Sequence, residues 1–161
     1  MSDWSDVKLG QVAEFINGDR GKNYPSEGDF VDKGIPFINA GHLTDGEVDF
    51  SGMNYISESR YHLLGSGKTR QNDILYCLRG SLGKTAIVRH EGDAAIASSL
   101  VIIRPSDDCN VGYLYHFLTS PEISAKRTRV RARGSLAISR RFVSTHWNIF
   151  HRKEASVRVR G

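Results

Sequence analysis

The chain has 161 residues, of which 39% are hydrophobic and 25% charged, and this composition is close to that of an ordinary globular domain. Its longest apolar stretch, residues 94–103, is much shorter than the roughly 20 residues of a membrane-spanning helix. The formal net charge of +4 combines two unlike parts: residues 1–125 carry 11 Lys and Arg against 17 Asp and Glu, and residues 126–161 carry 11 against 1. These numbers predict one folded domain with an acidic body, a basic C-terminal segment and no membrane span.

The N-terminus and the cysteines indicate the expected compartment. Residues 1–6 lack the basic stretch followed by an apolar one that begins a secretory leader, so a cytoplasmic location is expected. Cys77 lies in an apolar run and Cys109 in a polar segment, and this pair forms neither a disulfide framework nor a CxxC metal motif. Both are expected to be free thiols.

The N-terminal third predicts one helix and one long loop. A helix is predicted over residues 9–16, because apolar residues recur at i, i+3, i+4 and i+7 and Gly18 follows in the position of a C-cap. Residues 17–34 contain four glycines and a proline among charged residues, which is typical of an irregular loop. Loops of this length inside a compact domain usually carry function or are disordered.

Strand patterns dominate the middle of the chain, and helices follow. The predicted strands are residues 35–38, 53–56, 73–78, 84–88 and 95–103. Turns are expected at Asp45-Gly46 and over residues 79–83. Asn110 caps a predicted helix over residues 111–119, and Ser120-Pro121 begins another. This order of elements predicts a mixed α/β (α+β) fold.

Several segments imitate catalytic or cofactor motifs without meeting their requirements. Residues 63–69 and 80–85 contain a Gly-Lys-Thr, but both lack the glycine that a phosphate-binding loop needs five residues before it. The six histidines show no zinc-ligand spacing, and the Asp6-Val7-Lys8 triplet has no well-placed acidic partner for nuclease chemistry. An Asp/Asn-Pro-Pro-aromatic signature of adenine methyltransferases and a Gly-x-Ser-x-Gly elbow are absent. The sequence therefore predicts no catalytic residue, metal ligand or cofactor.

One ordered series of segments is more specific than any of these motifs. Its members, in chain order, are Trp4, residues 7–10, 15–18, 34–38, 55–57, 72–75, 79–84, 86–88 and 113–118. In order and spacing, this series resembles the target recognition domain of specificity subunits in type I DNA restriction-modification systems. The resemblance covers about residues 4–125, and it implies a twisted β-sheet with flanking helices.

Beyond residue 125 the resemblance becomes weaker. Residues 134–145 are similar to the segment that closes such a domain, so a single recognition domain is expected over residues 4–145. The proline-rich stretch and the long helical spacer that normally follow are not found, and residues 146–161 form a basic tail. Its composition suggests a truncated or frame-shifted gene end. Arg127, Arg129, Arg131 and Arg133 would add non-specific attraction to phosphates, and a disordered tail is an interpretation at least as good.

The resemblance implies a non-catalytic role, the reading of a few base pairs in double-stranded DNA. Arginine or lysine then pairs with guanine, asparagine or glutamine with adenine, and phosphate contacts set the register. The candidate DNA-binding residues lie in the glycine-rich loops and turns and in the segment after the predicted strand 35–38: Arg20, Lys22, Asn23, Asn39, His42, Lys68, Arg70, Gln71, Arg79, Ser81 and Lys84. For each one alone, a solvated loop side chain is an equally good interpretation.

Two other classes of function stay open at this point. One is a non-functional or regulatory fragment that cannot join a methyltransferase complex, because the helices that dock the methyltransferase subunits in full-length family members are missing. The other is a module that binds protein, which the acidic body would permit. A nucleotidase is a distant third alternative.

Overall fold

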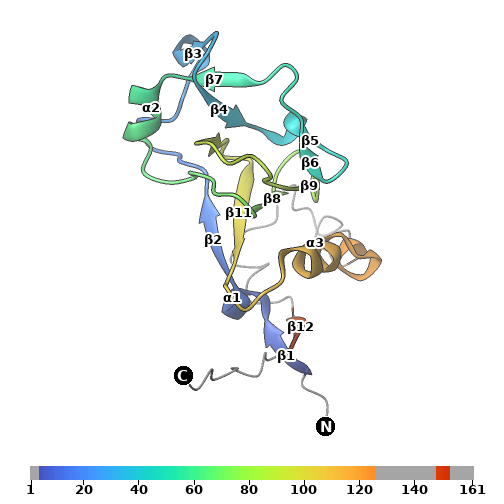
Figure 1. The fold of residues 1–161 in the computed structure, drawn as a ribbon. Helices are drawn as coiled ribbons and strands as arrows, with labels where there is room; N and C mark the ends of the chain where they lie inside the picture. The colour runs from blue at the N-terminus through green and yellow to red at the C-terminus, as the bar shows by residue number, and fades with distance from the viewer. Residues whose placement is uncertain (1–3, 126–147, 153–161) are drawn as a thin grey trace, which may run out of the picture.

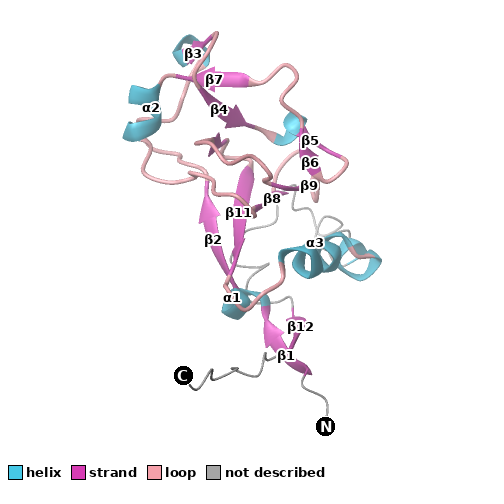
Figure 2. Ribbon diagram, in the orientation of Figure 1, coloured by secondary structure: helices cyan, strands magenta, loops and turns pink. Residues whose placement is uncertain are grey.

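The computed structural model describes residues 4–125 and 148–152, and within these ranges the chain forms three β-sheets with short helices at their margins (Figures 1 and 2). The six-stranded sheet has the order β2 (Ala13–Asn17), β11 (Leu100–Pro105), β8 (Ile74–Cys77), β9 (Thr85–Ile87), β6 (Glu47–Val48) and β5 (Leu43–Thr44). The four-stranded sheet has the order β10 (Ala95–Ile96), β4 (Ile35–Ile38), β7 (Asn54–Ile56) and β3 (Phe30–Val31). The third sheet pairs β1 (Trp4–Lys8) with β12 (Asn148–Arg152).

The helices are few and short. They are α1 (Leu9–Val12), α2 (Glu58–Leu63), α3 (Val111–Thr119) and the 3-10 helices η1 (Glu27–Asp29) and η2 (Ala40–His42), and residues 121–125 are also helical. This mixed α/β architecture with sheets and few helices confirms the predicted fold class. None of the helices in the described ranges has the length and apolar character needed to cross a membrane.

Strands β8 and β11 form the centre of the molecule, and both are apolar along most of their length because both faces of their sheet are covered. Alternate residues enter different clusters: Ile74 and Tyr76 pack with Leu114 and Leu118 of α3, whereas Leu75 and Cys77 pack in a cluster with residues of the four-stranded sheet. Cys77 and Cys109 are buried free thiols, as predicted.

Two predicted elements have the wrong type or extent. The helix expected over residues 9–16 ends at Val12, and residues 13–17 form β2, because five residues pair with β11 from Ala13↔Pro105 to Asn17↔Val101. The single strand expected over residues 95–103 is two strands, since the chain turns at residues 97–99 and passes from the four-stranded to the six-stranded sheet.

Other segments agree with their patterns or add to them. Residues 35–38 and 111–119 form the predicted strand and helix, and Asn110 Oδ1 accepts a hydrogen bond from Tyr113 N at 2.9 Å as the expected cap. Asp45 and Gly46 have φ of 51° and 83° between β5 and β6, which is the geometry of a tight hairpin. The sequence did not predict α2, η1 or β3.

Strand β12 falls inside the segment expected to be a separate tail. It pairs with all five residues of β1 in an antiparallel ladder, from Trp4↔Arg152 to Lys8↔Asn148. The four alternating arginines at 127–133 and the segment expected to close the domain, residues 134–145, lie outside the described residues.

Candidate nucleic-acid interface

Four strands end at the same edge of the molecule. Because β2 and β8 both run antiparallel to β11, their carboxyl ends lie at the same edge, where β11 begins: Asn17 pairs with Val101 and Cys77 with Leu100. Figure 1 shows β2 and β11 side by side as they approach this edge. The parallel strands β4 and β10 also end there, since Ala97 N donates to Ile38 O at 2.8 Å. We call residues 18–24, 39–41, 79–84 and 97–99 the loop edge.

Arg20 and Arg79 are neighbours at the loop edge. Arg20 Nη2 donates to Ser98 O at 3.1 Å, and Leu78 N, next to Arg79, donates to Ser99 O at 2.9 Å. Partial burial lowers the pKa of Arg20, and the positive charge of Arg79 lowers it further. Both side chains are exposed, and among the described residues neither forms an ion pair with a carboxylate.

The loop edge has little negative charge, although the body of the protein is acidic. The segments that build it and lead to it, residues 33–44, 74–90 and 94–106, contain no Asp or Glu. Asp19 is the one carboxylate in residues 18–24, and its oxygens accept from Gly21 N at 2.6 Å and Gly65 N at 2.7 Å. These amide hydrogen bonds hold the pKa of Asp19 below its ordinary value. The negative charge of Asp19 is therefore stabilised by hydrogen bonds within the protein.

The loop over residues 18–24 is fastened to the sheet at both ends. A Cβ on Gly18 would lie 2.6 Å from Ala97 O, so only glycine permits this close approach of two backbone segments. Tyr24 Oη accepts from Ser98 N at 3.4 Å, and its ring packs edge-on against Phe37. Asn23 Nδ2 donates to Leu63 O at 3.1 Å, so this side chain has a hydrogen-bond partner within the protein. Arg20 and Lys22 are exposed to solvent.

The turn between β8 and β9 presents three of the predicted residues. Gly80 and Gly83 have positive φ, Gly83 N donates to Cys77 O at 3.0 Å, and Cys77 N donates to Lys84 O at 2.9 Å. These bonds close a compact turn, as the sequence predicted. Its exposed residues include Arg79, Ser81 and Lys84.

Asn39 and His42 shape the 3-10 turn η2 after β4. Asn39 Oδ1 accepts from Gly41 N at 2.8 Å, and Asn39 N donates to His42 Nδ1 at 3.1 Å. Asn39 lies half-buried at the loop edge, whereas His42 is only 8% exposed. The histidine therefore has a structural partner and little surface to offer a ligand.

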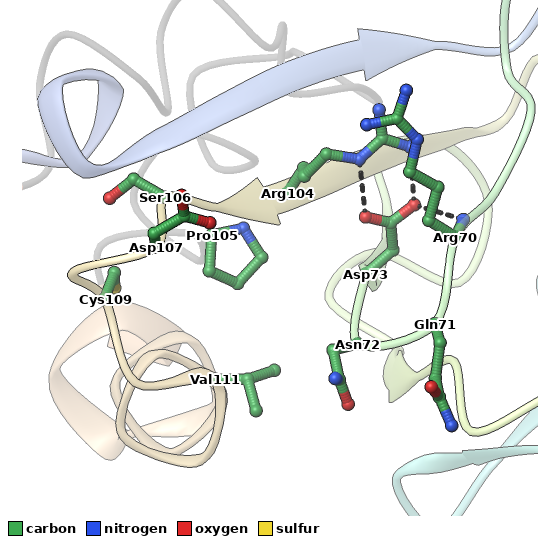
Figure 3. A pocket seen from close by; sticks show the side chains of 10 residues that line it. All are labelled: Arg70, Gln71, Asn72, Asp73, Arg104, Pro105, Ser106, Asp107, Cys109 and Val111. Carbon is green, nitrogen blue, oxygen red and sulfur yellow. Dashed lines mark hydrogen bonds and ion pairs between the residues drawn. The ribbon is translucent and has the colours of Figure 1, made fainter.

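Lys68, Arg70 and Gln71 lie elsewhere, before the first residue of β8 and so at its other end. The ammonium group of Lys68 lies 4.8 Å from the centre of the Tyr61 ring. Gln71 Nε2 donates to Arg89 O and to Glu91 Oε1, both at 3.4 Å. Arg70 and Gln71 line an open pocket of about 340 Å³ (Figure 3). The structure thus separates the predicted residues into two groups.

The sequence did not predict a buried ion pair that lines that pocket. Arg104 Nε and Nη2 each lie 2.8 Å from an oxygen of Asp73, and Arg70 N donates to the same carboxylate at 2.7 Å (Figure 3). Asp73 is 1% exposed, and its hydrogen bonds raise the pKa of Arg104. This ion pair joins the ends of β8 and β11. Ser98 and Tyr24 were also missed at the loop edge, although the Ser98-Ser99 break in an apolar run was a usable signal.

Comparison with known proteins identifies the family of the chain. Residues 1–137 match the family of the type I restriction modification DNA specificity domain, and the chain belongs to this family. Over 122 residues it is 33% identical to the type I restriction enzyme EcoBI specificity subunit of Escherichia coli, a match that covers 74% of this chain and 25% of that protein. The chain therefore spans about a quarter of the length of this relative.

Solved structures show the same fold. The crystal structure of the HsdS subunit from Thermoanaerobacter tengcongensis superposes with a TM-score of 0.68 and 20% identity, covering 92% of this chain and 33% of that one. The type I restriction-modification S subunit from M. genitalium superposes with a TM-score of 0.65 and 18% identity, covering 93% and 34%. The predicted resemblance and fold are confirmed.

Proposed function

We propose that this chain binds double-stranded DNA in a sequence-specific manner, as the target-recognition module of a type I restriction-modification specificity subunit, and that the loop edge is the surface that meets the duplex. The observation that carries the proposal is the concentration there of cations without a carboxylate partner, on a body of net negative charge. A protein of this overall charge approaches DNA through a local basic surface. We propose no catalytic step. Because the proposed ligand is DNA, we also propose a cytoplasmic location.

The proposed role of each side chain follows from the hydrogen-bond donors and acceptors that have no partner within the described residues. Arg79 has the planar donor group that suits guanine or a phosphate, while Lys22 and Lys84 suit phosphates. Asn39 uses its oxygen in η2, which leaves its amide nitrogen for an acceptor on a base. Asn23, His42, Lys68 and Gln71 have partners within the fold, so base reading is assigned to the loop-edge set.

The extent of the domain and its protein partners are part of the proposal. The recognition domain expected over residues 4–145 stays a prediction, and the β1–β12 ladder supports including β12 in the same domain. We further propose methyltransferase subunits as the class of protein partner, because the sequence resemblance gives them that role beside full-length family members. Co-expression with such a subunit tests this point: co-purification is expected, and a subunit that elutes alone contradicts it.

Selection from a library of randomised duplexes tests DNA reading itself. We expect the full chain to enrich a motif of a few base pairs at near-physiological salt. Arg79→Ala should cost about 1–3 kcal/mol at the enriched site if this residue reads a base, and should weaken binding to all duplexes alike if it contacts a phosphate. Lys33→Gln is the matched control, since it removes an exposed charge before the other end of β4. Binding without an enriched motif would contradict sequence-specific recognition.

A further inference from the structure

The two arginines of the loop edge are placed to act together. Residues 20 and 79 follow strands that lie on either side of β11, two strand spacings or about 10 Å apart. Both loops are hydrogen-bonded to the same connecting segment. The side chain of Arg20 donates to Ser98 O, and Leu78 N, one residue before Arg79, donates to Ser99 O. Arginine side chains from these positions can reach a common point above residues 98–99.

Their mutual charge is uncompensated within the described residues. The nearest sequence neighbour with a carboxylate, Asp19, is held by the amides of Gly21 and Gly65. Two guanidinium groups that share a site without a carboxylate repel each other, and an anion between them removes that repulsion. A tetrahedral phosphate has enough oxygens to accept from both guanidinium groups at once.

The hydrogen bond from Arg20 to Ser98 O orients this pair. It uses one terminal nitrogen of the guanidinium and leaves the remaining N–H groups free. Among the described residues, no hydrogen bond occupies the Arg79 side chain. One arginine is thus held in place and the other is free to close on a ligand.

From this geometry we infer that Arg20 and Arg79 form a single two-arginine site for one phosphate group of the DNA backbone, fixed in position by the turn over residues 97–99. The inference rests on the proposed function and deepens it. It assigns both arginines to register-setting rather than to base reading. Base identity is then read by other residues of the loop edge.

The salt dependence of DNA binding tests this assignment. Each neutralised phosphate contributes about 0.9 to the slope of log K against log salt concentration. Arg20→Gln, Arg79→Gln and the double variant should each lower the slope by about the same 0.9, and their affinity losses should be far from additive. The matched control Lys33→Gln should leave the slope unchanged. A double variant that loses about 1.8, or single variants that relax the sequence preference without changing the slope, would overturn the inference.

A phosphate titration separates this inference from the proposed function. In ¹⁵N NMR spectra, inorganic phosphate should shift the Nε–Hε signals of Arg20 and Arg79 along one binding curve. In the Arg79→Gln variant the Arg20 signal should stop responding. Separate curves, an unchanged Arg20 response in that variant, or no response at all would contradict a shared site. The phosphate titration can be interpreted even if the chain binds no duplex. Failure to bind any duplex would contradict the proposed function but not the shared phosphate site.

Discussion

Asp19 determines the shape of the loop that carries Arg20. Its two oxygens accept from the amides of Gly21 and Gly65, which closes the loop on itself and ties it to the segment after α2. Allowing for partial exposure, we expect Asp19→Ala to lower the free energy of unfolding by about 1–2 kcal/mol. Urea denaturation measures this loss. Asp32→Ala, which replaces an exposed aspartate between β3 and β4, is the control and should have little effect.

The same carboxylate makes stability depend on pH. Because the pKa of Asp19 is lower in the folded state than its ordinary value of 3.8, its contribution is present above about pH 4. The contribution is lost as the pH falls through the folded-state pKa. Asp29 and Asp49 have lowered pKa values for a similar reason, through bonds from Ser26 and Ser51, and act in the same window. Asp19→Asn should therefore make the decline of Tm between about pH 5 and pH 3 shallower, without abolishing it. An identical decline in the variant would contradict this role.

Arg104 and Asp73 form the buried ion pair on which the ends of β8 and β11 depend. Removing one partner leaves a buried charge alone, so Arg104→Leu should cost about 3–5 kcal/mol of stability. The double change Asp73→Leu with Arg104→Leu should recover part of this loss, because no charge then stays buried. Arg89→Leu, an exposed control, should be nearly neutral. Equal losses for Arg104→Leu and Arg89→Leu in urea denaturation would show that the ion pair does not matter.

At the residue scale, the sequence predicted which loops carry polar and charged residues, but not which of these side chains have partners within the fold. Arg20, Arg79 and Lys84 follow or precede strand ends, so their exposure was predictable from turn chemistry. His42 and Gln71 find partners within the fold, and His42 lies inside its own 3-10 turn. Such contacts depend on backbone geometry that the residue types alone do not specify.

Among the elements, the crossing of residues 18 and 67 fixes how the loop edge meets the rest of the fold. Gly67 has φ of 80°, and a Cβ there would lie 2.8 Å from the Cα of Gly18. Gly52 has φ of 67° with open space around it, so it isolates the cost of the backbone conformation. We expect Gly52→Ala to cost about 1 kcal/mol and Gly67→Ala to cost clearly more, about 2–3 kcal/mol. Equal Tm losses in the two variants would show that the close approach does not matter.

The β1–β12 ladder is tested by its register. Val7 lies opposite Ile149, so Val7→Cys with Ile149→Cys should form a disulfide rapidly under mild oxidation. Val7→Cys with His151→Cys, two residues out of register, should form one much more slowly. Burial raises the pKa of the Cys77 and Cys109 thiols, so the native cysteines should not interfere. Equal rates for the two pairs would contradict the ladder.

The sequence predicted elements well where local chemistry decides them and poorly where pairing does. Asn110 and the Asp45-Gly46 pair act locally, and both were recognised. Residues 13–17 fit a helical period, but pairing with β11 makes them a strand. The division of residues 95–103 between two sheets is also a tertiary effect, with Ser98 and Ser99 at the turn as its only local sign.

For the whole molecule, the distribution of charge matters more than its sum. The net charge of +4 arises from residues 126–161, whereas residues 1–125 have 17 acidic and 11 basic residues. Three acid-free segments lead to the loop edge, and most carboxylates of residues 1–125 lie outside it. A module with this charge distribution should bind DNA through the loop edge and not through its acidic surfaces.

Hydrogen–deuterium exchange of the full chain, with and without duplex DNA from the enriched pool, tests recognition through the loop edge most directly. We predict slower exchange on DNA binding in residues 18–24, 39–41, 79–84 and 97–99. We predict no change in residues 49–53 and 89–93, which lie in other loops. Protection of those loops, with unchanged exchange at the loop edge, would contradict DNA recognition through this edge.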